Sequence, residues 1–174
     1  MSAATPRRRV DAAARVRLLV LDVDGVLTDG RLYYGTRGEA LKVFHVRDGV
    51  GLKLLAAAGV TLAVISGRRS AMTARRCREL GIHHLLQGVE DKVAAFQRLR
   101  GRLRLPPGAC ACVGDDLPDV PLMGEVGLSF AVADAHPRAR AAAQVITRLP
   151  GGRGAVREVC DHLLEARRHA PAIK

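Results

Sequence analysis

Short apolar runs alternate with longer amphipathic segments along the chain, and most runs end in a polar or glycine-rich loop. The runs of strand length cover residues 16–21, 60–66, 85–87, 109–113, 128–132 and 145–146. The segments with helical character cover residues 46–58, 69–80, 90–102, 117–124, 138–142 and 154–168. Strands and helices that alternate at this spacing form a parallel sheet with right-handed crossovers. The pattern therefore predicts an α/β fold, a Rossmann-like three-layer sandwich with a mostly parallel sheet.

Residues 31–44 interrupt this alternation. Two short segments, RLYY and EALKVF, flank the turn GTRG, which predicts a β-hairpin inserted after the first strand. The chain contains no internal repeat and no long linker, and its 174 residues suffice for one hydrophobic core. We expect a single domain over residues 16–168, with residues 1–15 as a flexible arm or short helix and residues 169–174 as a C-terminal tail.

The composition narrows the classes of function. The formal net charge is +11, which favours anionic partners, but aromatic residues make up only 3% and Trp is absent. Because so few aromatic side chains are available to stack on bases, we expect no nucleic-acid partner. The four cysteines form no CxxC pair, the N-terminus lacks the apolar core of a signal peptide, and no apolar run is long enough to span a bilayer. We therefore expect a cytoplasmic protein with no membrane partner.

Three polar loops follow predicted strands. They are DVDGVLTDG after the first strand, SGRRS after the second, and GDDLPD after the strand at residues 109–113. Ligands of open α/β sheets bind at the carboxyl ends of the strands. We therefore expect these loops to converge on one edge of the sheet and to form the functional site there.

The first of these loops carries two carboxylates. Asp22 and Asp24 are two residues apart, so their side chains point to the same side of an extended segment. Gly25 allows a sharp turn and a close approach of the backbone to a ligand. Alone, this pattern fits a surface turn as well as it fits an acid–base pair or a metal site. The other loops favour the functional interpretation.

A second acidic group follows the strand at residues 109–113. It consists of Asp115 and Asp116, with Asp119 one helical turn further on. Mg²⁺ prefers oxygen ligands and is usually held by one or two carboxylates plus a substrate phosphate. A site made from Asp22 and Asp115, with Asp119 or Asp116 behind them, meets this demand. We therefore predict Mg²⁺ as the cofactor.

Two further residues suit a phosphate group. Ser66, at the end of the second strand, offers a hydroxyl and a loop of backbone N–H groups. Lys92 offers a positive charge, although a single lysine on a helix is more often only a solvated charge. We expect both residues to bind phosphate oxygens beside the carboxylates.

Taken in order, DVDGVLT, SGR, Lys92 and GDDLPD resemble the four motifs of the haloacid dehalogenase superfamily. The resemblance implies that Asp22 attacks phosphorus and forms an aspartyl-phosphate. It implies that Asp24 protonates the leaving oxygen and later activates water, and that its backbone carbonyl binds Mg²⁺ together with Asp22 and Asp115. Ser66 and Lys92 would hold the transferring phosphoryl group.

The spacing of these motifs leaves no room for a large cap domain. Only 41 residues separate Asp24 from Ser66, and 25 separate Ser66 from Lys92. A phosphatase without a cap either acts on a macromolecule or borrows a lid from another subunit. We therefore expect an oligomer, with Tyr33 and Tyr34 of the hairpin at the subunit contact.

A narrower resemblance covers residues 16–167. The segments FHVRDGVGLKLL, ISGRRS, VGDDLPDVPLM, VGLSFAVADAHP and GGRGAVREVC are similar to those of the 3-deoxy-D-manno-octulosonate 8-phosphate phosphatase family. This resemblance implies a capless homotetramer of lipopolysaccharide sugar synthesis, with active sites near subunit interfaces and a C-terminal tail that reaches a neighbouring site.

The same resemblance implies a pocket for the sugar acid. The substrate-binding residues that it implies are Asp24, His45, Val46, Arg47, Asp48, Gly49, Lys53, Arg68, Arg76 and Lys92. His45 and Lys53 replace the Asn and Arg that are usual in the family, and Lys lacks the bidentate fork of Arg. Arg68 favours the octulosonate over nonulosonate 9-phosphates, whose phosphatases tend to carry Glu there. A phosphatase for such a nonulosonate and a non-catalytic oligomeric subunit are the alternatives.

Overall fold

The centre of the protein is a six-stranded sheet in the order β5-β4-β1-β6-β7-β8, in which every neighbouring pair is parallel. The computed structural model describes residues 11–169. The strands are β1 (Leu18–Leu21), β4 (Thr61–Ser66), β5 (His84–Gln87), β6 (Cys110–Gly114), β7 (Leu128–Ala131) and β8 (Val145–Ile146). Every residue of β1 and β6 is buried. These strands are continuous apolar runs because helices cover both faces of a parallel sheet.

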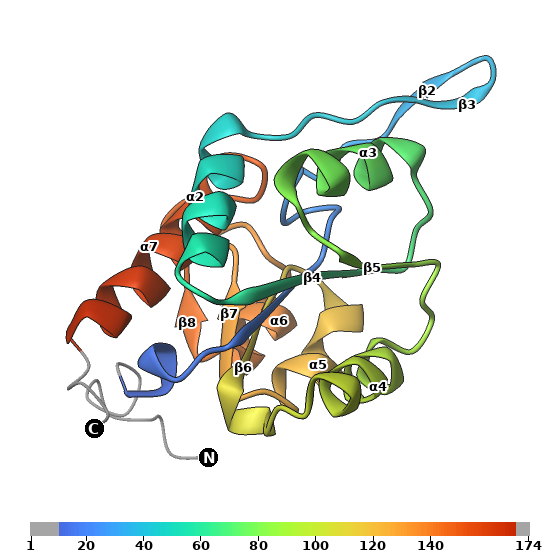
Figure 1. The fold of residues 1–174 in the computed structure, drawn as a ribbon. Coiled ribbons are helices and arrows are strands. Elements are labelled where there is room, and N and C mark those ends of the chain that lie inside the picture. Colours follow the sequence, from blue (N-terminus) through green and yellow to red (C-terminus); the bar gives the residue numbers. More distant parts are fainter. Residues whose placement is uncertain (1–10, 170–174) are drawn as a thin grey trace.

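Two groups of helices cover the sheet (Figure 1). The helices are α2 (Val46–Ala57), α3 (Ala71–Leu80), α4 (Lys92–Leu103), α5 (Val120–Met123), α6 (Pro137–Ala142) and α7 (Ala155–His169), with the 3₁₀ turns η1 (Pro107–Ala109) and η2 (Leu117–Asp119). Helix α2 packs against α3 and α7 on one face, and α5 packs against α4 and α6 on the other. The predicted α/β three-layer sandwich is confirmed. No helix among residues 11–169 is both long and apolar enough to cross a membrane.

Local capping fixes where the helices begin. Helices α3 and α4 each begin two residues later than the sequence pattern predicts. Ser70 and Asp91 stand immediately before them in extended conformation, and their side chains accept hydrogen bonds from the backbone N–H groups of Thr73 (3.4 Å) and Ala94 (2.9 Å). A side chain that caps a helix in this way lies outside its first turn.

The predicted hairpin insertion is confirmed. Strands β2 (Tyr33–Gly35) and β3 (Gly38–Leu41) pair in antiparallel fashion and project away from the body of the molecule (Figure 1). Within the described residues, the hairpin and α2 are the only elements between β1 and β4, and no separate cap domain is present.

The ends of the chain extend beyond the described residues. Residues 11–14 form a helical turn, and Ala13 is fully buried in the core. Residues 1–10 and 170–174, which hold most of the predicted arm and tail, lie outside the described residues.

The direction in which the chain adds strands to the sheet reverses at β1. The chain adds β4 and β5 on one side of β1 and then crosses over to add β6, β7 and β8 on the other side. Leu21 at the end of β1 lies opposite Val113 of β6, and the N–H of Asp22 donates to the carbonyl of Val113 at 3.2 Å. The loops after β1 and β6 therefore lie side by side at the switch point, where open α/β sheets bind ligands.

The glycines before α7 pack against the loop after β1. The N–H of Gly152 donates to the carbonyl of Val26 at 2.9 Å, and that of Gly151 donates to Asp134 Oδ1 at 2.9 Å. A Cβ atom at Gly151 would lie 1.7 Å from the carbonyl oxygen of Gly25. Only glycine allows the two backbones to approach this closely.

Two glycine substitutions should have opposite effects on stability. Gly151→Ala should lower the free energy of unfolding by about 3 kcal/mol, because its methyl group meets backbone that must shift. Gly101→Ala should raise it by about 0.5–1 kcal/mol, because Gly101 lies in α4 with no atom near the added methyl group. Urea unfolding of both variants measures the difference. Equal effects of the two substitutions would contradict the close approach at Gly151.

Candidate active site

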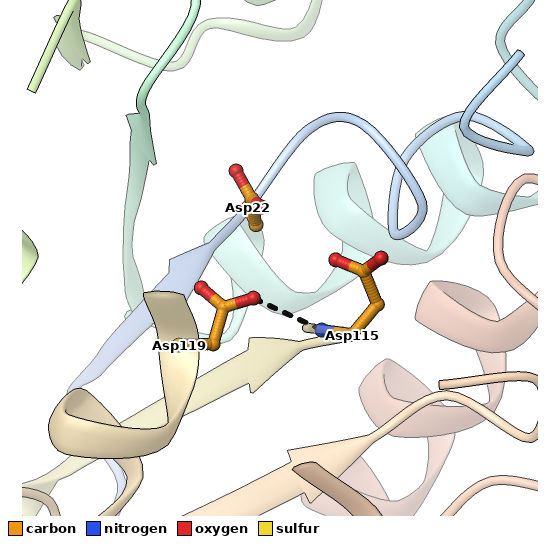
Figure 2. Close-up of side chains that lie close together, drawn as sticks. All are labelled: Asp22, Asp115 and Asp119. Atoms are coloured by element: carbon orange, nitrogen blue, oxygen red, sulfur yellow. Dashed lines mark hydrogen bonds between the residues drawn. The ribbon is translucent and has the colours of Figure 1, made fainter. Parts of the chain in front are cut away.

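Three carboxylates meet at the carboxyl ends of β1 and β6 (Figure 2). Asp22 follows β1, Asp115 follows β6, and Asp119 is the last residue of η2. One ligand oxygen from each lies within 4.8 Å of the others. The structure thus brings together residues from two of the three polar loops that the sequence predicts to converge.

Lys92 lies against this cluster. It is the first residue of α4, and its side chain is only 5% exposed. Its Nζ is 2.9 Å from Asp22 Oδ2 and 2.7 Å from Asp119 Oδ1. Burying an ammonium group removes it from water and is unfavourable unless carboxylates lie close enough to compensate the charge. The possibility that Lys92 is merely a solvated helix charge is therefore wrong.

Asp119 is committed to contacts within the protein. Its Oδ1 accepts from Lys92, and its Oδ2 accepts from the N–H groups of Asp115 (3.0 Å) and Asp116 (3.3 Å), the first of which is drawn in Figure 2. Asp116 itself is exposed and caps η2 by accepting from the N–H of Leu117 at 2.7 Å. Asp119 thus orients Lys92 and the loop, which leaves Asp22 and Asp115 as the carboxylates available to a ligand.

The cluster is short of positive charge. Burial and the charge of Asp119 raise the pKa of Asp22 to about 6, although Lys92 opposes the shift. Burial and repulsion from Asp22, Asp119 and Asp116 raise the pKa of Asp115 to about 8. Burial opposes the charge on Lys92, but Asp22 and Asp119 outweigh it and raise its pKa, which keeps Lys92 an ammonium. One ammonium does not balance three neighbouring carboxylates.

The donor set fits Mg²⁺. Carboxylate oxygens are the hard ligands that this ion prefers, and a divalent cation would relieve the repulsion between Asp22 and Asp115. Gly25 keeps this space open: a Cβ atom there would lie 2.1 Å from Asp115 Oδ2. The carboxylate of Asp115 therefore lies directly against the backbone that follows Asp24, where a backbone carbonyl can join the carboxylates as a ligand.

Asp24 is held by two cations from different elements. Lys42, which follows β3, donates to Asp24 Oδ1. Arg68, in the loop after β4, places its Nε 3.6 Å from Asp24 Oδ2. The side chain of Lys42 is only 2% exposed, whereas that of Arg68 is 42% exposed. The base of the hairpin therefore belongs to the candidate active site.

Glu39 joins these two cations. Its carboxylate lies 3.3 Å from Lys42 Nζ and 3.6 Å from a guanidinium nitrogen of Arg68, and it accepts from Ser70 Oγ at 2.6 Å. Burial opposes the charge on Glu39, but the hydrogen bond from Ser70 and the charge of Lys42 hold its pKa below the ordinary value. Lys42 and Glu39 are not among the site residues that the sequence predicts. The available signal was a lysine in a lysine-poor chain, close after the Asp22 loop.

Ser66 lies at the carboxyl end of β4, the strand that pairs with β1. It is buried, and its Oγ accepts from the N–H of Arg68 at 3.3 Å. The strand pairing places Ser66 at the same edge of the sheet as Asp22. This is where the sequence predicts a phosphate-binding hydroxyl.

Of the residues predicted to bind the sugar acid, Asp24, Arg68 and Lys92 lie at the site already described, and the others are dispersed over α2 and α3. Asp48 is buried, and its Oδ1 accepts from the N–H of Arg157 at 2.8 Å, which ties α2 to the start of α7. Arg76 lies against Gly49 and is 3.4 Å from Glu79. The remaining members lie at the start of α2 or are exposed on it: His45, Val46, Arg47 and Lys53. Among residues 11–169, no hydrogen bond or ion pair joins any of these α2 and α3 residues to the acidic cluster.

A family model described as haloacid dehalogenase-like hydrolase matches residues 81–154. The chain is 50% identical to the 3-deoxy-D-manno-octulosonate 8-phosphate phosphatase of Yersinia pestis, over 90% of this chain and 84% of that protein. It is 53% identical to the Escherichia coli K12 protein of the same name, over 88% of this chain and 82% of that protein.

A solved structure has the same fold. The crystal structure of the Moraxella catarrhalis 3-deoxy-D-manno-octulosonate 8-phosphate phosphatase, in complex with magnesium ion, phosphate ion and a KDO molecule, superimposes with a TM-score of 0.91. It is 41% identical to this chain, and the match covers 94% of each chain.

The response of stability to Mg²⁺ should depend on pH. Folding raises the pKa of Asp22 from 3.8 to about 6 and that of Asp115 from 3.8 to about 8. Because the folded state then binds more protons than the unfolded state, the two raised pKa values stabilise the metal-free protein at low pH. This stabilisation is fully present below about pH 4 and is lost as the pH rises through about 6 to 8. Mg²⁺ requires the ionised carboxylates, so the gain in Tm at saturation should be small near pH 5.5 and on the order of 5 °C near pH 8.5.

Thermal unfolding with and without Mg²⁺, at both pH values, measures this effect. Asp115→Asn removes a carboxylate from the cluster and should abolish most of the gain. An equal gain at both pH values, or an unchanged gain in Asp115→Asn, would contradict a metal site at these residues.

Proposed function

Because this chain belongs to the 3-deoxy-D-manno-octulosonate 8-phosphate phosphatase family of haloacid dehalogenase-like hydrolases, we propose that it hydrolyses 3-deoxy-D-manno-octulosonate 8-phosphate. The products are the free sugar acid and phosphate, in lipopolysaccharide sugar synthesis. The observation that carries the proposal is the cluster of Asp22, Asp115 and Lys92 at the switch point of the sheet. It combines a nucleophile, a cation site and a fixed positive charge.

In the first step, a carboxylate oxygen of Asp22 attacks phosphorus, and the bond from phosphorus to the sugar oxygen breaks. Asp24 donates a proton to the departing oxygen, because an alkoxide is a poor leaving group. The phosphoryl group is then bound to Asp22, and Asp24 is left as a carboxylate. Lys92 Nζ is 2.9 Å from Asp22. It holds the nucleophile in place and stabilises the negative charge of the phosphoryl group that Asp22 receives.

In the second step, water attacks phosphorus and gives its proton to Asp24. The bond between phosphorus and Asp22 breaks, which releases phosphate and restores both carboxyl groups. Ser66 and the backbone N–H groups of its loop bind phosphoryl oxygens during both steps. When bound by Asp22, Asp115 and the backbone carbonyl of Asp24, Mg²⁺ supplies positive charge that offsets the charge of the phosphoryl oxygens.

The sugar acid extends from this site toward α2 and α3. Arg68 lies at the rim beside Asp24, and its partly exposed guanidinium, which contacts Asp24, Glu39 and Tyr34, can turn to meet the carboxylate of the substrate. The sugar acid binds along Arg76, Lys53 and the segment at residues 45–49. Because Asp48 is buried against α7, we assign it to holding this segment in place.

The first test is phosphate release from 3-deoxy-D-manno-octulosonate 8-phosphate with Mg²⁺, beside a panel of other sugar phosphates. The wild type should prefer the octulosonate, and Asp22→Asn should lose at least about 10³-fold in kcat/KM because the nucleophile is gone. Asp161→Asn is the matched control, since Asp161 is an exposed partner of Arg157 on α7. It should retain full activity.

The outcome for each substrate separates the alternatives. Preference for a nonulosonate 9-phosphate would keep Asp22 as the nucleophile and replace the octulosonate as substrate. Absence of activity on every phosphate, in folded protein with Mg²⁺, would favour a non-catalytic subunit and contradict the proposal.

We also infer a homotetramer with active sites near the subunit interfaces. The site has no cap of its own, and apolar side chains are exposed next to it. Helix α2 exposes Val46, Val50 and Leu54, which recur every four residues and so form one stripe. The hairpin exposes Tyr34 and Leu41. Exposed apolar side chains of this kind are typical of protein–protein contacts.

We propose that the protein is located in the cytoplasm, a reducing compartment, and its free thiols support this proposal. All four cysteines lie within the described residues, and all are free and buried. Burial raises the pKa of Cys77 and of Cys110 to about 11, which makes them unreactive.

Val50→Glu should dissociate the tetramer, because a carboxylate in an apolar contact between subunits is costly. Light scattering should then give a mass below four times the chain mass of 18.6 kDa, and activity on the sugar phosphate should fall with it. Ile146→Glu is the control, since it changes an apolar residue of similar exposure on β8. A wild-type monomer that is fully active on the sugar phosphate would contradict the inference.

A further inference from the structure

The structure describes three lysines, Lys42, Lys53 and Lys92, and two of them are buried. Lys92 lies between the carboxylates of Asp22 and Asp119. Lys42 lies in the same way between the carboxylates of Asp24 and Glu39. Each carboxylate of the Asp22–Asp24 pair therefore has its own buried ammonium, supplied by a different element and backed by a second carboxylate.

The position of Lys42 is not required by packing. It follows the short strand β3, whose neighbours in the hairpin are mostly exposed, yet its own side chain turns inward and is 2% exposed. Burying an ammonium group is unfavourable unless carboxylates compensate it. The compensation comes from Asp24 on one side and Glu39 on the other. The burial of Lys42 is therefore favourable only while Asp24 is its partner.

We propose that Lys42 is a positioning residue for the proton transfer by Asp24. It fixes one carboxyl oxygen of Asp24 and stabilises the carboxylate that remains after the proton has moved to the leaving oxygen. The inference rests on the proposed phosphatase function, and it adds to that function a residue of the hairpin that acts through Asp24 without touching the phosphate.

Glu39 anchors this arrangement to the body of the protein. Its second oxygen accepts from Ser70 Oγ at 2.6 Å, and Ser70 is the N-cap of α3. A continuous set of contacts thus runs from Asp24 through Lys42 and Glu39 to a helix end. A proton donor held by such supporting contacts keeps the geometry that proton transfer needs.

Arg68 differs from Lys42 in its freedom to move. It lies 3.6 Å from both Asp24 Oδ2 and Glu39 Oε1, and its side chain is 42% exposed. An anionic substrate can draw Arg68 away without disturbing the buried contact to Lys42. Asp24 Oδ1 would then stay fixed, and Oδ2 would become free to give its proton to the leaving oxygen.

The test uses leaving groups that differ in their need for a proton. A sugar alkoxide must be protonated as it departs, whereas p-nitrophenolate departs as a stable anion. In single-turnover experiments, Lys42→Gln should release the sugar from its phosphate about 100-fold more slowly than the wild type, the scale of general acid catalysis. Release of p-nitrophenol from p-nitrophenyl phosphate should change by less than about 3-fold.

Further variants separate positioning from a general structural role. Lys42→Arg keeps the positive charge and should recover part of the rate on the sugar phosphate. In an Asp24→Asn background, Lys42→Gln should cause no further loss, because the group on which it acts is already gone. Arg98→Gln removes an exposed positive charge from α4 and should leave both rates unchanged.

Equal losses on both substrates, no loss on either, or a full additional loss in the Asp24→Asn background would each overturn the role of Lys42. These results would leave the proposed function intact if the wild type hydrolyses the sugar phosphate. A folded wild type that hydrolyses neither substrate would overturn both. Thermal unfolding of each variant checks that it is folded, and if Lys42→Gln fails to fold, Lys42→Met and Glu39→Gln must show the same dependence on leaving group or the proposal fails.

Discussion

The chemistry of the site depends on the repulsion among three closely spaced carboxylates, one buried and two partly buried, at the carboxyl ends of β1 and β6. Asp22, Asp115 and Asp119 bring three carboxylates together, and within residues 11–169 Lys92 is the one cation paired with them. Burial and this imbalance raise the pKa values of Asp22 and Asp115, and the imbalance makes the site a receptor for a divalent cation. A protein tolerates such a cost where the charges serve a reaction, and phosphoryl transfer is a reaction that needs a nucleophile and a cation in contact.

The rest of the fold keeps these charges in place. Parallel pairing of β1 with β6 sets the two acidic loops side by side, and the buried strands leave little freedom for them to separate. Glycines at positions 25 and 151 allow backbone and carboxylate to pack at distances that any side chain would prevent. The site is thus built from rigid strand ends, and the loops contribute side chains at fixed positions.

The hairpin links the chemistry to assembly. Glu39 of β3 and Lys42, which follows it, surround Asp24, while Tyr34 and Leu41 of the same hairpin and the stripe on α2 expose apolar side chains. A contact between subunits at the hairpin would restrain the same segment that holds Asp24, the proposed proton donor. In a protein without a cap, such a restraint can take over the role of a lid in setting the active geometry.

The sequence by itself determined the order of strands and helices along the chain and the polar loops after β1, β4 and β6, because these follow from apolar periodicity and from glycine and acidic residues at strand ends. It could not determine which charges become partners. In the sequence, Lys42 is one polar residue of a predicted hairpin, yet the structure buries it against Asp24. Asp48 is part of a segment predicted to bind the sugar, yet it ties α2 to α7. Only the tertiary structure decided these contacts, because they join residues from separate elements, and burial, which gives a charge its energetic weight, is a property of the packed chain.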